Sequence, residues 1–193
     1  FQRYGLPEGL SQEAVFAITQ DQQGFIWIAT QEGLNRFDGY EFVTFFHEAN
    51  NPNSLSNDAI YSMVAAQDGT LWLGTGNGGI NRFDPKTESF ERLSKQQGLS
   101  SDRINIIFED NTETVWVGTD DRGLNRYDPE TNSFETFVFS PQDNHSISNN
   151  TVRSIHQDNL GRLWVGTDKG LNLFNKKKQQ FIRFNTNTEA PEA

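Results

Sequence analysis

Charged residues cluster in two short segments of the sequence, where their types could support acid–base chemistry or ligand binding. Paired carboxylates with a basic neighbour are the groups that polysaccharide lyases and glycosidases use, and Asp120, Asp121 and Arg153 are the candidates for such a reaction. The same groups could also bind a ligand without transforming it. The charged residues in these two segments are Asp120, Asp121, Arg122, Asp168 and Lys169.

The sequence contains no recognisable spacing of metal-binding residues. The three histidines, His47, His145 and His156, are far apart and have no metal-binding spacing. The Asp120-Asp121 pair lacks the alternating oxygen ligands and the glycine of a calcium loop. The chain has no cysteine, which removes thiolate ligands and thiol nucleophiles together. We therefore predict no metal and no cofactor.

Tryptophan is the other residue type that could bind a ligand, because its ring can stack on a sugar. The chain has four tryptophans, at positions 27, 72, 116 and 164. Each one follows a turn and precedes a small residue and a threonine, in a block that returns four times. This strict period of about 45 residues favours packing between repeats over four identical sugar platforms.

Threonine and asparagine recur at fixed distances after each tryptophan. The threonine hydroxyls are expected to bond neighbouring backbone, and the asparagines are expected to be buried and to satisfy turn amides. We therefore predict a structural role for the whole repeated set. Its members are Trp27, Trp72, Trp116, Trp164, Thr30, Thr75, Thr119, Thr167, Asn35, Asn81, Asn125 and Asn172.

Four short extended runs make up each repeat. The first runs are expected at 14–20, 59–65, 103–109 and 151–157, and the fourth runs at 40–46, 89–93, 133–139 and 180–184. Four short strands joined by tight turns can pair only as an antiparallel meander. One four-stranded sheet per 45 residues predicts an all-β fold of β-propeller blades.

The predicted blades cover about 10–46, 55–93, 99–139 and 147–184. Residues 1–4 resemble a fourth strand that belongs to another blade, and 185–193 are expected to be a linker or tail. We interpret the chain as an excerpt of a larger, seven-bladed propeller. The open edges of such an arc are expected to favour self-association.

Positions that vary between the repeats are the better candidates for function. Some lie in the turns between the second and third strands, and others form one column in the innermost strand. We predict that they line a ligand face or channel. Besides the five charged residues above, they are Gln31, Glu32, Asn77, Phe16, Tyr61, Asn105 and Arg153. Two further expectations concern Arg36, Arg82 and Arg126, which should pair with acidic groups, and 176–178, which should be solvated turn residues.

The overall charge restricts the partners. The net charge is −10 and the pI is about 4.7, so nucleic acid and acidic membrane surfaces would be repelled. No run of about 18 apolar residues is present, so contact with a membrane is expected only through other parts of a parent chain.

The repeated block, Asp-x-x-Gly-x-Ile/Leu-Trp-Ile/Val-Gly-Thr followed by Gly-Leu-Asn-Arg-Phe-Asp, resembles the two-component regulator propeller repeat. The resemblance covers about residues 1–184. It implies the periplasmic sensor region of a membrane signalling protein, whose output is a histidine kinase or a diguanylate cyclase. It also implies a ligand such as an oligosaccharide, or a neighbouring protomer, and a relayed conformational change. A propeller enzyme and a non-catalytic interaction scaffold remain the alternatives.

Overall fold

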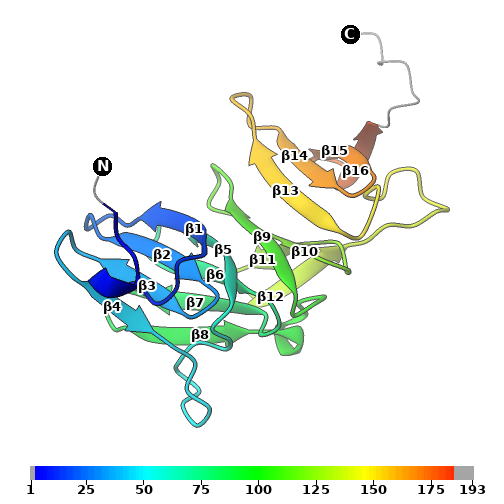
Figure 1. Ribbon diagram of the computed structural model, residues 1–193. Coiled ribbons are helices and arrows are strands. Elements are labelled where there is room, and N and C mark those ends of the chain that lie inside the picture. The colour runs from blue at the N-terminus through cyan, green and yellow to red at the C-terminus, as the bar shows by residue number, and fades with distance from the viewer. Residues whose placement is uncertain (1–2, 185–193) are drawn as a thin grey trace.

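Each repeat folds into one four-stranded antiparallel sheet whose strands lie in sequence order (Figure 1). The computed structural model describes residues 3–184. The first two sheets consist of β1 (Val15–Gln20), β2 (Ile26–Thr30), β3 (Leu34–Phe37), β4 (Phe42–Phe45), β5 (Ile60–Ala65), β6 (Leu71–Thr75), β7 (Ile80–Asp84) and β8 (Ser89–Leu93). The other two consist of β9 (Ile104–Glu109), β10 (Val115–Thr119), β11 (Leu124–Asp128), β12 (Ser133–Phe137), β13 (Val152–Gln157), β14 (Leu163–Thr167), β15 (Gly170–Asn175) and β16 (Gln180–Phe184).

The predicted all-β blade architecture is therefore confirmed, with small differences at the strand ends. The strand expected at 40–46 is shortened to Phe42–Phe45. The reason is a turn in which the Asp38 carboxylate accepts the backbone N–H groups of Tyr40 and Glu41. Tyr40 is consequently held outside the sheet.

The structure describes part of the N-terminal segment and none of the residues after 184. The expected strand at 1–4 falls partly on Phe1 and Gln2, which lie outside the described residues, as do 185–193. Arg3 and Tyr4 are not in a strand. The Tyr4 ring packs on Phe37 and Phe42 of the first sheet, with centroids 5.0 and 6.2 Å apart.

The sheets follow one another so that their first strands are neighbours: β1 contacts β5, β5 contacts β9, and β9 contacts β13. Figure 1 shows these strands along one side of each sheet. The other strands fan outward in order. Two short 3₁₀ turns, Leu6–Glu8 and Lys95–Gln97, precede the first and third sheets. No helix within 3–184 is long and apolar enough to cross a membrane.

The core lies between neighbouring sheets, where the tryptophans of the first three sheets each pack on an aromatic ring of the following sheet. The ring centroids of Trp27 and Phe83 are 5.3 Å apart, those of Trp72 and Tyr127 4.9 Å, and those of Trp116 and Phe174 5.1 Å. Trp27 and Trp116 are 0% and 1% exposed. Each of these three tryptophans therefore buries a large apolar surface at an interface between two sheets.

In the second and third sheets, the glycine of the Trp-x-Gly-Thr block is required by close sheet packing. A Cβ atom on Gly74 would lie 2.5 Å from Ile104 Cγ2, and one on Gly118 would lie 2.5 Å from Val152 Cγ1. Both neighbours belong to the first strand region of the following sheet. A larger side chain at either glycine would push the two sheets apart.

Backbone hydrogen bonds also join the sheets. Gly33 N–H donates to Asp58 O at 2.9 Å, Gly79 N–H to Asp102 O at 3.0 Å, and Gly123 N–H to Asn150 O at 2.8 Å. In each case the donor lies in the turn after a second strand, and the acceptor lies just before the first strand of the next sheet. The same bond thus fixes the register of every neighbouring pair of sheets.

Candidate functional site

The varying column of the first strands lies at a β-bulge in all four sheets. Strand pairing skips from Val15 to Ala17, and it skips at the corresponding place in the other three first strands. The extra residue of a bulge is left unpaired, and such residues often redirect a side chain next to a functional site. The bulged residues are Phe16, Tyr61, Asn105 and Arg153.

Phe16 and Tyr61 form an aromatic pair at the first two bulges. Their ring centroids are 4.9 Å apart and the rings are perpendicular. Phe16 is 43% exposed and Tyr61 37% exposed, so the pair offers apolar ring surface to solvent. The Tyr61 ring lies against Gly76, where a Cβ atom would come within 2.6 Å of Cε2. The ring therefore has a fixed place beside the β6–β7 turn.

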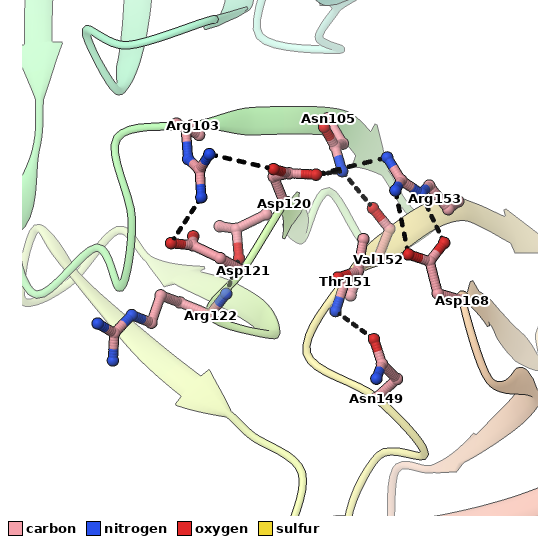
Figure 2. A network of polar contacts seen from close by, with 11 residues as sticks. Arg103, Asn105, Asp120, Asp121, Arg122, Asn149, Thr151, Val152, Arg153 and Asp168 are labelled. Atoms are coloured by element: carbon pink, nitrogen blue, oxygen red, sulfur yellow. Dashed lines mark hydrogen bonds and ion pairs between the residues drawn. The ribbon is translucent and has the colours of Figure 1, made fainter.

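The polar bulges of the third and fourth sheets are joined by a chain of ion pairs (Figure 2). Asp120 lies between two guanidinium groups, 3.4 Å from Arg103 and 3.4 Å from Arg153. Arg153 also binds both carboxylate oxygens of Asp168, at 2.7 and 3.0 Å. Arg103 in addition binds Asp121 at 3.0 Å.

Asn105 completes this group of residues. Its side-chain amide donates to Val152 O at 3.0 Å and to Asp120 at 3.5 Å, so it links the third sheet to the fourth. We call the set the rim network and keep that name below. Its members are Arg103, Asn105, Asp120, Asp121, Arg153 and Asp168.

The rim network is held in its charged form. The hydrogen bond from Arg153 lowers the pKa of the Asp168 carboxyl, and the same bond raises the pKa of Arg153. The pKa of Arg103 is raised by its bond to Asp121. The charged side chains of the network are between about one-third and just over one-half exposed. The network can therefore hydrogen-bond a polar ligand from solvent.

The other candidates from the sequence do not join the network. Figure 2 shows the Arg122 guanidinium directed away from it. Only the backbone N–H groups of Gln31, Glu32 and Lys169 take part in hydrogen bonds with side chains. Asn77 lies exposed in the β6–β7 turn. These four side chains make no hydrogen bond or ion pair within 3–184.

Arg103 belongs to the network although it was not among the candidates from the sequence. A signal for it was present. Arg103 O accepts the backbone N–H of Asp120, as Ala59 O accepts Gly76 N–H and Thr151 O accepts Asp168 N–H. Arg103 is therefore the charged member of a column whose other members are alanine and threonine. The criterion of variation between repeats, applied two residues before the bulge column, would have found it.

The repeated threonines and asparagines form a buried polar layer. Thr75 Oγ1 donates to Gly79 O at 2.9 Å, and Thr30, Thr119 and Thr167 bond Gly33, Gly123 and Gly170 in the same way. The carboxamide oxygens of Asn35, Asn81, Asn125 and Asn172 accept the backbone N–H groups of Ser11, Ser56, Ser100 and Ser148. Each asparagine thus holds the connection that enters its sheet.

Three of the four tryptophan N–H groups donate to an aspartate in the turn before their strand, at the end of the second strand that lies away from the threonine. Trp27, Trp116 and Trp164 donate to Asp21, Asp110 and Asp158 at 2.7, 3.1 and 2.9 Å. Lys176 binds Asp110 at 2.8 Å while its side chain stays 38% exposed. It is therefore a solvated turn residue, as expected for 176–178, that also forms an ion pair. The Asp110 carboxylate is 1% exposed, and such a buried charge requires a partner.

The repeated arginines pair with acidic groups. Arg36 binds Glu88 at 2.9 Å, Arg82 binds Asp68 at 2.7 Å, and Arg126 binds Glu135. Within residues 3–184 no group of three histidine, aspartate or glutamate side chains could hold a metal ion.

Four consecutive sheets with neighbouring first strands define a β-propeller protein. The bulge residues, which vary between the repeats, lie in these first strands. The four repeats match the family model of the two component regulator propeller at residues 9–32, 54–77, 98–121 and 146–169. The chain belongs to the two component regulator propeller family.

Three proteins with a similar sequence or structure come from signalling systems. A 45-residue segment is 47% identical to histidine kinase P4 of Formosa agariphila, over 23% of this chain and 3% of that protein. The fold is similar to the extracellular domain of BT3049 from B. thetaiotaomicron, described as a hybrid two component system, with a TM-score of 0.71 and 26% identity. The extracellular domain of BT4673 from the same organism gives a TM-score of 0.73 and 27% identity.

The chain covers only part of these proteins. The alignments include 94% and 93% of this chain but 31% and 25% of the two extracellular domains. Similarity to these domains supports a sensor role for the propeller.

Proposed function

We propose that this chain is part of the sensor region of a membrane-anchored signalling protein of the two-component type, located on the periplasmic side. We further propose that its four bulges bind an oligosaccharide. The observation that carries the proposal is the bulge column, because it places two exposed aromatic rings and a charged polar network in one row along the first strands.

Oligosaccharides need two kinds of contact, and the row offers both. Sugar rings stack on aromatic faces, which the Phe16–Tyr61 pair presents. Sugar hydroxyls bond to charged and amide side chains, which Asn105, Asp120 and Arg153 supply. A ligand that spans the row would contact all four sheets at once.

Ligand binding across several sheets could be relayed as a change of geometry. Asn105 and Arg153 already join the third sheet to the fourth through Val152 O and Asp120. A ligand that competes for these groups would bind one arrangement of the two sheets better than another. Such a difference in affinity is what shifts a population between two states.

Binding is favoured over catalysis by the electrostatics of the rim network. A general acid for glycoside cleavage needs a carboxyl group whose pKa is raised, so that it keeps its proton near neutral pH. The pKa of Asp168 is instead lowered by Arg153, and Asp120 and Asp121 each have an arginine partner. The rim network resembles a set of fixed charges more closely than an acid–base pair.

The test is an NMR titration of the chain with a panel of oligosaccharides of defined composition. We expect one of them to cause saturable shifts of the amides around Phe16, Tyr61, Asn105 and Arg153. These shifts should be lost in Tyr61→Ala and in Arg153→Ala. Lys169→Ala is the control, because its side chain lies outside the rim network, and it should bind like the wild type. Saturable shifts that survive both Tyr61→Ala and Arg153→Ala would refute the proposal, as would cleavage of the sugar.

A further inference from the structure

The second sheet differs from the other three in the turn before β6. In the other sheets, an aspartate in this turn accepts the hydrogen bond of the tryptophan N–H. Ala66 occupies the position of Asp21, Asp110 and Asp158, each of which accepts the indole N–H six residues later. Trp72 therefore has no such carboxylate. Among the described residues, none accepts a hydrogen bond from its Nε1–H group.

The third sheet faces this alanine with Pro129. Proline also occupies this position in the second sheet, as Pro85, and of the four sheets only the fourth has a lysine there. Pro129 follows directly after β11, at the position that Lys176 occupies after β15. At the interface between the third and fourth sheets, the Lys176 ammonium binds the Asp110 carboxylate at 2.8 Å, beside the Trp116 indole. The interface between the second and third sheets lacks both members of that ion pair.

A cavity of about 310 Å³ lies where this ion pair is missing. This volume is at the lower end of the range for small-molecule sites. The rings of Trp72 and Tyr127, with centroids 4.9 Å apart and planes inclined at 63°, contribute to its apolar part. Its lining includes Ala66, Trp72, Glu109, Glu113, Tyr127 and Pro129.

The charges around the cavity are mostly negative. Asp68, Glu109 and Glu113 line it together with one cation, Arg82, and Arg82 is already paired with Asp68 at 2.7 Å. Neither Glu109 nor Glu113 forms an ion pair within 3–184. Burial raises the pKa of Glu109, and the neighbouring carboxylates of Asp68 and Glu113 act in the same direction. A positive charge placed in the cavity would therefore be stabilised.

We propose that this cavity binds a small organic cation, a primary ammonium group on a short alkyl chain, in the place that Lys176 takes at the next interface. The alkyl chain would lie against Trp72, Tyr127 and Pro129, and the ammonium would donate to Glu109 and Glu113. The site is distinct from the bulges and goes beyond the proposed function, because Glu113 and Asp120 lie at opposite ends of β10.

The test uses n-pentylamine and 1-pentanol, which share an alkyl chain and differ in charge. Binding is followed through the Trp72 indole N–H signal, assigned with Trp72→Phe. We expect saturable binding of pentylamine with a Kd on the order of 1 mM, and binding of pentanol weaker by about tenfold or more. Equal binding of the two compounds, or no saturable shift with pentylamine, would overturn the proposal.

Two variants locate the site. Ala66→Asp combined with Pro129→Lys copies the Asp110–Lys176 pair into the cavity and should weaken pentylamine binding by about tenfold or more. Glu113→Gln keeps the length of the side chain, removes one charge and should weaken binding several-fold. It also serves as the reporter if the double variant does not fold. Lys169→Ala is the control and should bind normally. Unchanged affinity in Glu113→Gln would contradict the assignment of the ammonium to this carboxylate.

Discussion

Equivalent positions of the four repeats hold the same residue types at the interfaces between the sheets and different residue types in the bulge row of the first strands. At the interfaces, tryptophan, threonine and asparagine occupy the same positions in every sheet and are mostly buried. At the bulges, the four residues are phenylalanine, tyrosine, asparagine and arginine. Burial restricts the residue type because every change alters packing or leaves a polar group unpaired, whereas an exposed bulge accepts many types.

The largest expected effect lies at an interface. Trp116→Ala should reduce the free energy of unfolding by about 4 kcal/mol, because the ring is buried against Phe174 of the following sheet. Chemical denaturation followed by circular dichroism measures this. Trp164→Ala is the matched comparison and should cost clearly less, since Trp164 is only half-buried and packs on Phe184 of its own sheet. Equal losses would show that the interface does not determine the effect.

The buried polar layer should rank second. Asn172→Ala should cost about 2 kcal/mol, because it leaves Ser148 N–H and Val165 O without their partners. Asn105→Ala at the bulge should cost less, about 1 kcal/mol, because Asn105 is only half-buried and one of its two partners, Asp120, is about one-third exposed. The same denaturation experiment compares the two variants. A larger loss for Asn105→Ala would reverse the distinction between interface and bulge.

Acid should weaken one interface in particular. Burial raises the pKa of Asp110, but hydrogen bonds from Lys176, Thr112 and Trp116 outweigh it and bring the pKa to about 2, from an ordinary value of 3.8. The folded state therefore holds this carboxylate charged more strongly than the unfolded chain does. The resulting stability, about 2 kcal/mol, is present above pH 4 and is lost as the pH falls towards 2.

The pH dependence is measured as the free energy of unfolding of the wild type and of Asp110→Asn between pH 6 and pH 2. The difference between the two proteins should shrink across that interval. A constant difference would mean that the charge of Asp110 does not stabilise the interface.

The smallest effect is expected in the rim network. Arg153→Ala removes two ion pairs, yet the side chains are half-exposed, so it should cost about 1 kcal/mol or less. The cost should decrease further when the salt concentration is raised. Unfolding in low and high salt gives both values. A loss comparable to that of Trp116→Ala would place Arg153 among the structural residues.

The fold was predictable to within one residue at most strand ends, because the tryptophan blocks repeat and their turns are short. The first strand expected at 59–65 is observed at Ile60–Ala65, and the fourth strand expected at 89–93 is observed at Ser89–Leu93. The bulge column was also identified as the varying part of the first strand. Local sequence was sufficient for these features because they depend on one repeat alone.

Contacts between repeats were not predictable in the same way. Lys176 and Asp110 are 66 residues apart, and their ion pair depends on how the third and fourth sheets meet. Ala66 was visible in the sequence as a departure from the repeat. Its meaning depends on the residues that face it from the next sheet, such as Glu113 and Pro129. One sequence does not indicate which residues of two repeats share a space.

The backbone bonds between the sheets have a consequence for how such proteins grow in evolution. The donor, such as Gly79 N–H, and the acceptor, such as Asp58 O, belong to the same repeat unit but serve opposite neighbours. A tandem duplication of the gene segment for one unit therefore supplies a matching donor and acceptor at each new junction. The added blade would have its full set of bonds in the first generation, before any further mutation.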